Sequence, residues 1–256
     1  MGDRTDGPTY SPEVDGNEEQ TTQRPHTHLF RGNGFGAPPE ITRFEHETDG
    51  RFKPANTTGA MCIFTAGVIL DELNRTIDIA DRRAGCGFVF RPGTHLHITD
   101  RALSFRLERK GPHLQRRSPS RFRAHLRAAL AAIAYKPWYE EGWTTLVIAT
   151  SSKYVWAGIY RLTGSEPGQW KRECLNGMSN GDLWYDLLLQ IDIMRTQGNM
   201  HVAFWWLPEN WNQEAIGCAD WAARYLGPVE EWSDVVTQGV ARRPLLSAES
   251  EKIKSE

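Results

Sequence analysis

The chain has 256 residues, with 30 lysines and arginines against 32 aspartates and glutamates, and its formal net charge is −2. Hydrophobic residues make up 39% of the chain and charged residues 24%, which are proportions of globular proteins and exclude a wholly disordered chain. The near-neutral balance also excludes a uniformly basic nucleic-acid binder, although it leaves room for a local basic surface.

The two ends of the chain are polar and the middle is apolar. Residues 1–59 are rich in Gly, Pro, Thr and acidic residues, and we expect a disordered or loosely docked N-terminal arm in which Ile41, Phe44 and Phe52 contact the edge of the domain. Residues 60–226 carry the periodic elements and are predicted to form one domain. Residues 227–256 are predicted to form a C-terminal tail.

Strand signals come first along the central region. Runs at 61–70, 86–91 and 102–108 are β-rich and are separated by glycine and Pro-Gly sequences, which predicts three antiparallel strands. The period then changes: Leu126, Leu130 and Ile133 follow helical spacing, and Pro137 stops that helix.

The second half of the domain alternates between helices and strands. Apolar runs at 145–150 and 200–207 are predicted to be buried strands, and helices are predicted at 152–161, 180–195 and 211–225. Three antiparallel strands followed by helical crossovers predict a mixed five-stranded α/β sheet with helices on both faces.

Six local motifs in this order resemble the ribonuclease H type 1 domain. They are F-T-A-G at 64–67, A-G-C-G-F at 84–88, R-A-H-L-R-A at 123–128, A-T-S-S-K-Y-V at 149–155, N-G-D-L-W at 180–184, and Asn212 followed by Ala215. The resemblance covers about residues 61–225. It implies a ribonuclease H-like fold, whose activity is cleavage of the RNA strand of RNA–DNA hybrids by two divalent metal ions held by four carboxylates.

The four positions that match those carboxylates hold Ala66, His125, Ser151 and Ile216. Magnesium prefers oxygen ligands, and none of these side chains offers an anionic oxygen. We therefore expect no metal site, no cofactor and no catalysis at this place. His125 has two open interpretations: a histidine that protonates near neutral pH and meets a phosphate, or a neutral one that is hydrogen-bonded to Ser151.

Displaced acids offer an alternative. Asp71 follows the first predicted strand, and Asp220 lies one helical turn beyond Ile216 on a similar face. If these carboxylates replaced the missing ones, the chain would be an active Mg²⁺-dependent endoribonuclease.

The densest charge in the chain lies at residues 106–127, which we call the basic ridge. It holds eight basic side chains against one acidic one, Glu108. Such a surface is typical of phosphate binding, whereas the alternative is an ordinary solvated loop. The candidate nucleic-acid contacts are Arg109, Lys110, Arg116, Arg117, Arg121, Arg123 and Arg127, together with Asn212.

These observations favour a catalytically degenerate ribonuclease H-like protein that binds RNA–DNA hybrid or another nucleic acid. A third possibility is an interaction scaffold that binds proteins through its charged ends. The longest nearly apolar run, at 60–70, is far shorter than the roughly 20 residues of a membrane span. The first thirty residues hold no apolar signal core, and the four cysteines form no C-x-x-C pair. We therefore expect an intracellular protein, cytoplasmic or nuclear, with no membrane partner.

Overall fold

The computed structural model describes residues 50–54, 58–71, 76–92, 101–163 and 177–236, and the structural statements below concern these residues. Most of the N-terminal arm and the end of the C-terminal tail lie outside them. Within these ranges, no helix combines the length and the apolar character needed to cross a lipid bilayer.

One mixed sheet forms the centre of the molecule. Its strands are β1 (Ala60–Ile69), β2 (Ala84–Val89), β3 (Ala102–Arg106), β4 (Thr145–Thr150) and β5 (His201–Trp206). Their order across the sheet is β3-β2-β1-β4-β5. Strands β1, β2 and β3 pair antiparallel, whereas β1, β4 and β5 pair parallel. The predicted fold class, a mixed five-stranded α/β sheet, is confirmed.

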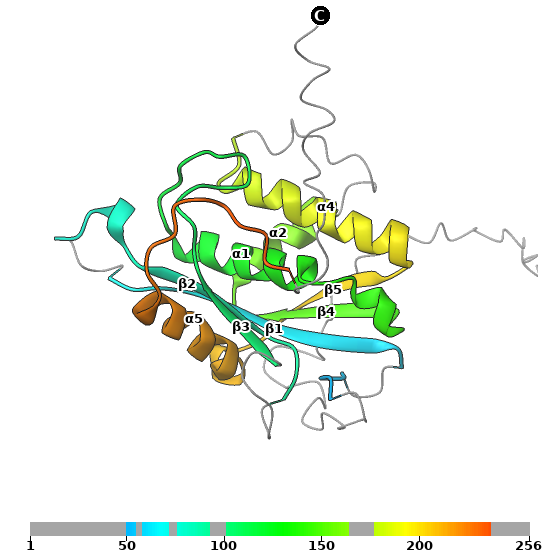
Figure 1. Cartoon of the computed structure of the whole chain (residues 1–256). Helices are drawn as coiled ribbons and strands as arrows, with labels where there is room; N and C mark the ends of the chain where they lie inside the picture. Colours follow the sequence, from blue (N-terminus) through cyan, green and yellow to red (C-terminus); the bar gives the residue numbers. More distant parts are fainter. Residues whose placement is uncertain (1–49, 55–57, 72–75, 93–100, 164–176, 237–256) are drawn as a thin grey trace, which may run out of the picture.

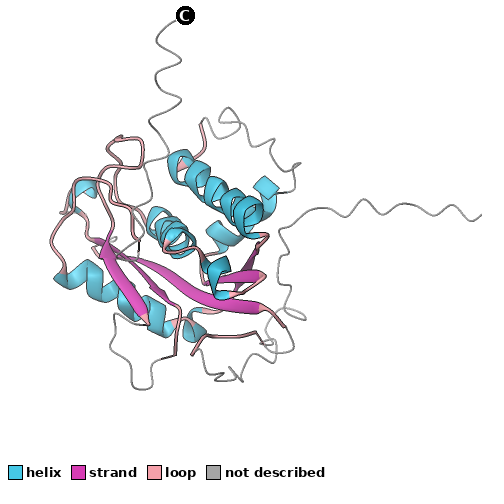
Figure 2. Ribbon diagram, turned by 45° about the vertical axis from the view of Figure 1, so that its right-hand side comes forward, coloured by secondary structure: helices cyan, strands magenta, loops and turns pink. Residues whose placement is uncertain are grey.

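Helices cover both faces of this sheet, also as predicted. They are α1 (Arg121–Ala134), α2 (Lys153–Thr163), α4 (Gly181–Gly198) and α5 (Gln213–Tyr225). Helix α1 lies on β1 and is covered in turn by α4, with α2 beside it, and α5 packs alone against β2 and β1 from the other side (Figures 1 and 2). Because α1 lies between the sheet and α4, it is buried almost all round, which its alanine-rich sequence permits.

Close backbone contact explains why particular glycines occur on the central strands. A Cβ added at Gly85 would lie 2.2 Å from the carbonyl oxygen of Ala219 and 2.6 Å from the amide nitrogen of Ala223, so α5 crosses β2 at this residue. Gly67 allows the same approach on the opposite face, where a Cβ would lie 2.2 Å from the backbone nitrogen of His125. The motifs that resemble the ribonuclease H domain therefore contain residues that fix the distance between helix and sheet.

Gly85→Ala is expected to lower the free energy of unfolding by about 1–3 kcal/mol, because the new methyl group forces backbone to move rather than a flexible side chain. Gly217→Ala on the same helix is the matched control. A Cβ there meets nothing within 4 Å, and alanine raises helix propensity, so stability should stay level or rise. Urea denaturation of both variants measures the difference, and an equally stable Gly85→Ala protein would contradict the close contact.

The described residues 50–54 of the N-terminal arm lie against the domain. The carbonyl oxygen of Phe52 accepts from the amide of Cys62 at 2.8 Å, and the Phe52 ring meets Phe64 edge-on, with the ring centroids 5.0 Å apart. Arg51 is buried and forms an ion pair with Glu141 at 2.5 Å. The predicted contact of Phe52 with the domain edge is confirmed, whereas Ile41 and Phe44 lie outside the described residues.

The predicted C-terminal tail also begins as packed structure. Val229 forms a parallel bridge with Glu108, and Trp232 and Val235 pack against the main hydrophobic core. The described residues 227–236 therefore lie against the domain. Trp232 and the valines of this segment are the sequence signal that could have indicated docking.

Candidate nucleic-acid interface and the carboxylate-free pocket

Two of the four positions that match family carboxylates are aliphatic in this chain and belong to the packing. Ala66 lies in β1, opposite Gly87 of β2, and is fully buried. Ile216, on the first turns of α5, is partly buried and packs against the cluster that contains Ala66. Neither residue offers an atom that binds a metal ion.

His125 faces the interior and has a backbone partner. Its Nδ1 accepts a hydrogen bond from the amide of Gly67 at 3.1 Å, and only 5% of the residue is exposed. Burial, and after it the positive charge of Arg121, lower the pKa of His125 to about 4, so the imidazole is neutral at pH 7. This favours the interpretation as a neutral residue, with Gly67 rather than Ser151 as its hydrogen-bond partner.

Ser151 and Asn212 meet at the ends of the central strands. The Asn212 amide nitrogen donates to the carbonyl oxygen of Thr65 at 2.9 Å and to the Ser151 hydroxyl at 3.3 Å. Asn212 is 1% exposed. It therefore connects β1, the end of β4 and the start of α5, and its buried position excludes the predicted contact with nucleic acid.

This group of four side chains does not fit a pair of magnesium ions. One of its positions is a buried methyl group, one is an aliphatic chain, one is an imidazole whose Nδ1 already accepts a hydrogen bond, and one is a neutral hydroxyl. Two dications need anionic oxygens to offset their mutual repulsion. Elsewhere in the described ranges, no three His, Cys, Asp or Glu side chains lie close enough to hold a metal ion.

The displaced acids are engaged by arginines. Asp71 accepts from Arg83 at 3.1 Å, and Asp220 accepts from Arg224 at 2.6 Å. Four residues of α5, about 6 Å of helix, separate Ile216 from Asp220, and the partner Arg224 lies one turn further away still. Asp71 lies past the end of β1, at least about 10 Å beyond Ala66 along the strand direction. Both carboxylates are therefore held in ion pairs with arginines.

The inner part of the basic ridge is buried in ion pairs, which corrects the assignment of Arg123 and Arg127 as phosphate contacts. Arg123 donates to both carboxylate oxygens of Asp182, at 3.0 and 2.7 Å, and Arg127 donates to both of Glu108, at 3.0 and 2.6 Å. Both arginines are 1% exposed. Burial raises the pKa of Asp182, but the hydrogen bonds and charge of Arg123 outweigh that effect, so this pKa lies below its usual range.

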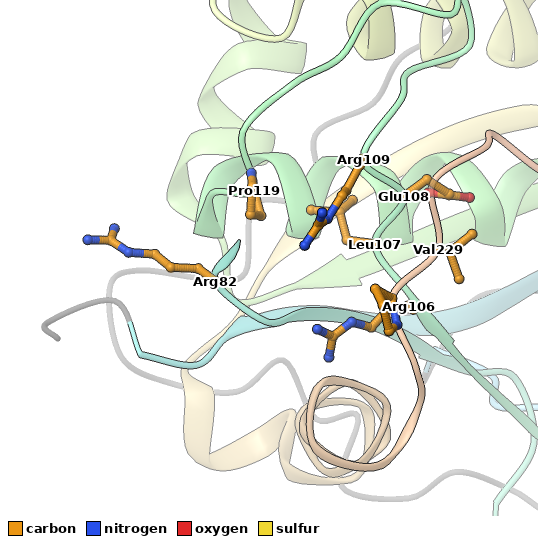
Figure 3. A pocket seen from close by; sticks show the side chains of 8 residues that line it. Arg82, Arg106, Leu107, Glu108, Arg109, Pro119 and Val229 are labelled. Atoms are coloured by element: carbon orange, nitrogen blue, oxygen red, sulfur yellow. The ribbon is translucent and has the colours of Figure 1, made fainter. Parts of the chain in front are cut away.

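Arg106, at the end of β3, is also turned inward and donates to the carbonyl oxygen of Ala223. Burial lowers its pKa, as do the charges of Arg83 and Arg109. A small cavity lies beside it, with the Arg106 and Arg109 guanidinium groups on one side and the Glu108 carboxylate on the other (Figure 3). The cavity has room for about one water molecule, so it does not accommodate a phosphate.

The outer part of the ridge projects from the domain as a loop that returns on itself. Lys110 and Arg116 form an antiparallel bridge, and the amide of Arg117 donates to the carbonyl oxygen of Arg109 at 2.8 Å. Ser120 ends the loop as the N-cap of α1, and its side chain accepts from the amide of Arg123 at 3.1 Å. This geometry places the outer part of the ridge, the loop, directly before the N-terminus of α1.

Three arginines of the ridge remain exposed. The side chains of Arg116 and Arg121 are 64% and 52% exposed, and Arg117 is also exposed. Arg116 lies 3.7 Å from a carboxylate oxygen of Glu230. Arg121 pairs with the exposed Glu209 at 3.0 Å, and Arg117 donates to Gln115. Exposed pairs of this kind are weak, so a phosphate backbone can displace the present partners of these guanidinium groups.

Arg109 and Lys110 are held by acids from distant parts of the sequence. Arg109 pairs with Asp81 and Glu230, each at 3.0 Å, and Lys110 pairs with Glu231 at 2.5 Å. Sequence reasoning missed Glu230 and Glu231, because a charge count over residues 106–127 does not contain them.

Comparisons with known proteins show a similarity of fold to solved structures and no match by sequence. No family model matches the chain, and no curated protein matches it significantly. Solved structures similar to it include ribonuclease H1 from the archaeon Halobacterium salinarum, with 14% identity, a TM-score of 0.36, and coverage of 64% of this chain and 96% of that chain. LC11-RNase H1 in complex with RNA/DNA hybrid has 14% identity and a TM-score of 0.39, over 63% and 95% of the two chains.

The foamy viral protease-reverse transcriptase in complex with RNA/DNA hybrid is similar over 75% of this chain and 24% of that one, with 16% identity and a TM-score of 0.43. At these levels of similarity no residue of this chain inherits a role. The site is therefore interpreted from its own contacts.

Proposed function

We propose that this chain is a catalytically degenerate ribonuclease H-like protein that binds nucleic acid, with RNA–DNA hybrid as the first candidate, and does not cleave it. The observation that carries the proposal is the exposure of three arginines of the ridge, Arg116, Arg117 and Arg121, in a chain that holds no carboxylate at the four matching positions. Arginine binds phosphate oxygens in a bidentate manner, and such contacts need no metal ion.

The four neutral side chains at the matching positions support binding without catalysis. A carboxylate cluster would repel a phosphate backbone unless metal ions bridged the two, whereas Ala66, Ser151, Ile216 and neutral His125 exert no such repulsion. An intracellular location fits the thiols: Cys62, Cys86 and Cys218 are free and buried. The nuclease and scaffold alternatives gain no specific support from the contacts described above.

Arg116→Ala combined with Arg117→Ala tests the proposal. Fluorescence anisotropy of a labelled RNA–DNA hybrid should show about tenfold weaker binding at moderate salt, because two phosphate contacts are lost. The slope of log K against log salt should become shallower by about 0.9 for each lost contact, or about 0.7 where the contact is to a single strand.

Arg161→Ala combined with Arg195→Ala is the matched control, since it removes the same charge from the ends of α2 and α4. Its affinity should stay within about twofold of that of the unaltered protein. If the unaltered protein binds no hybrid even at low salt, the proposed function is wrong.

A further inference from the structure

The segment that follows α5 runs along the basic ridge and forms backbone hydrogen bonds with it. We call residues 228–234 the acidic strap, because they contain Glu230, Glu231 and Asp234. The amides of Arg109 and Lys110 donate to the carbonyl oxygens of Val229 and Glu230, each at 2.9 Å. In Figure 1 the strap is the orange-red trace that runs beside the green loop of the ridge. The backbone of the strap therefore fixes which side chains face the ridge.

An aromatic anchor holds the strap independently of its carboxylates. The guanidinium carbon of Arg127 lies 3.9 Å from the centroid of the Trp232 ring, and Arg127 also donates to the carbonyl oxygen of Ser233 at 2.7 Å. Trp232 itself packs against the hydrophobic core. Because Arg127 is buried and Trp232 packs on the core, these contacts hold the strap in place when its glutamates exchange partners.

The glutamates of the strap meet three cations of the ridge. Glu230 lies 3.0 Å from Arg109 and 3.7 Å from Arg116, and Glu231 lies 2.5 Å from Lys110. The Glu230 and Glu231 side chains are 48% and 64% exposed. In contrast to the buried pairs of Arg123 and Arg127, these pairs face solvent and can be exchanged for other anions.

We propose that the acidic strap is a built-in competitor of nucleic acid: the carboxylates of Glu230 and Glu231 occupy the positions that phosphates would take on Arg109, Lys110 and Arg116. This inference rests on the proposed function, and it adds regulation of the same surface. A tethered competitor acts at a high effective concentration, so it lowers affinity at every salt concentration. Each exposed pair is weak, so a polyanion displaces the carboxylates without unfolding the strap.

Glu230→Gln combined with Glu231→Gln tests the inference. Glutamine keeps the size of the side chain and the backbone pairing of the strap, and it removes only the charge. Anisotropy with a labelled RNA–DNA hybrid should show about tenfold tighter binding than the unaltered protein at moderate salt. The salt dependence should become steeper by about 0.9 in log–log slope for each of the two or three cations released.

Glu140→Gln combined with Asp192→Asn is the control, because it makes the same change in net charge at the end of the molecule that holds the C-terminal half of α4. Its affinity should rise by no more than about twofold. An equal gain in the control and in the strap variant would overturn the inference in favour of a general charge effect.

Two other outcomes distinguish a failure of the competitor role from a failure of nucleic-acid binding itself. If the unaltered protein binds hybrid and the strap variant binds no tighter, the competitor role is wrong and nucleic-acid binding stands. If neither protein binds hybrid at low salt, both proposals fall. Circular dichroism of each variant establishes that the fold is retained in the comparison.

Discussion

Arg123→Met is expected to lower the free energy of unfolding by about 3–5 kcal/mol, because it leaves the Asp182 carboxylate buried without its partner. Arg123 and Asp182 are 1% and 8% exposed, and two hydrogen bonds join them across α1 and α4. Chemical denaturation at pH 7 measures the loss. Since the guanidinium group does not reach the surface, the variant should bind hybrid with an unchanged salt slope.

Arg121→Met, two residues away on the same helix, is the control for this experiment. Its side chain is 52% exposed and pairs with the exposed Glu209, so stability should change by no more than about 0.5 kcal/mol. Adding Asp182→Leu to Arg123→Met should recover most of the lost stability, since an apolar pair replaces a lone buried charge. An Arg123→Met protein as stable as Arg121→Met would contradict the buried position of this pair.

The second large effect is a loss of folding stability at low pH that arises from His125. The pKa of His125 is about 4 in the folded chain against an ordinary 6.5, so the unfolded state binds the proton more readily between these values. Stability contributed by the neutral imidazole is therefore complete above pH 6.5, falls as the pH drops toward 4, and is absent below 4. The shift corresponds to about 3 kcal/mol of unfolding free energy.

His125→Asn separates this effect from the titration of acids elsewhere in the chain. The asparagine oxygen can accept the Gly67 amide in place of Nδ1 but takes up no proton in this range. Denaturation between pH 4 and 7 should show the unaltered protein losing about 3 kcal/mol more than the variant. Parallel stability curves for the two proteins would show that His125 is not buried in its neutral form.

The sequence predicted the sheet because the relevant interactions are local or repeat with a fixed period. The β-rich runs and the helical spacing of Leu126, Leu130 and Ile133 mark elements whose bounds agree with the structure to within a few residues. Gly67 and Gly85 added information, since each lies where a helix backbone meets a strand. These positions require glycine because a Cβ would collide with the helix backbone, and the glycines are visible in the sequence as part of the motifs.

The ridge was harder to predict, since charge pairing depends on residues far apart in the sequence. Asp182, Glu230 and Glu231 lie at least 50 positions beyond the arginines and the lysine that they neutralise. One signal was present: Arg123 and Arg127 lie within an alanine-rich helix that is buried on nearly all sides. Arginines in such a helix require buried acidic partners. Glu108, the one acidic residue of the ridge, is the partner of Arg127.

The central claim is that this protein binds nucleic acid and leaves it intact. The most direct measurement incubates the purified full chain with a labelled RNA–DNA hybrid at low salt, with Mg²⁺, with Mn²⁺ and with chelator, and follows binding and strand length together. We expect salt-sensitive binding of equal strength in all three conditions and a full-length RNA strand. Metal-dependent cleavage that disappears in Asp220→Asn, or the absence of binding in every condition, would contradict the account.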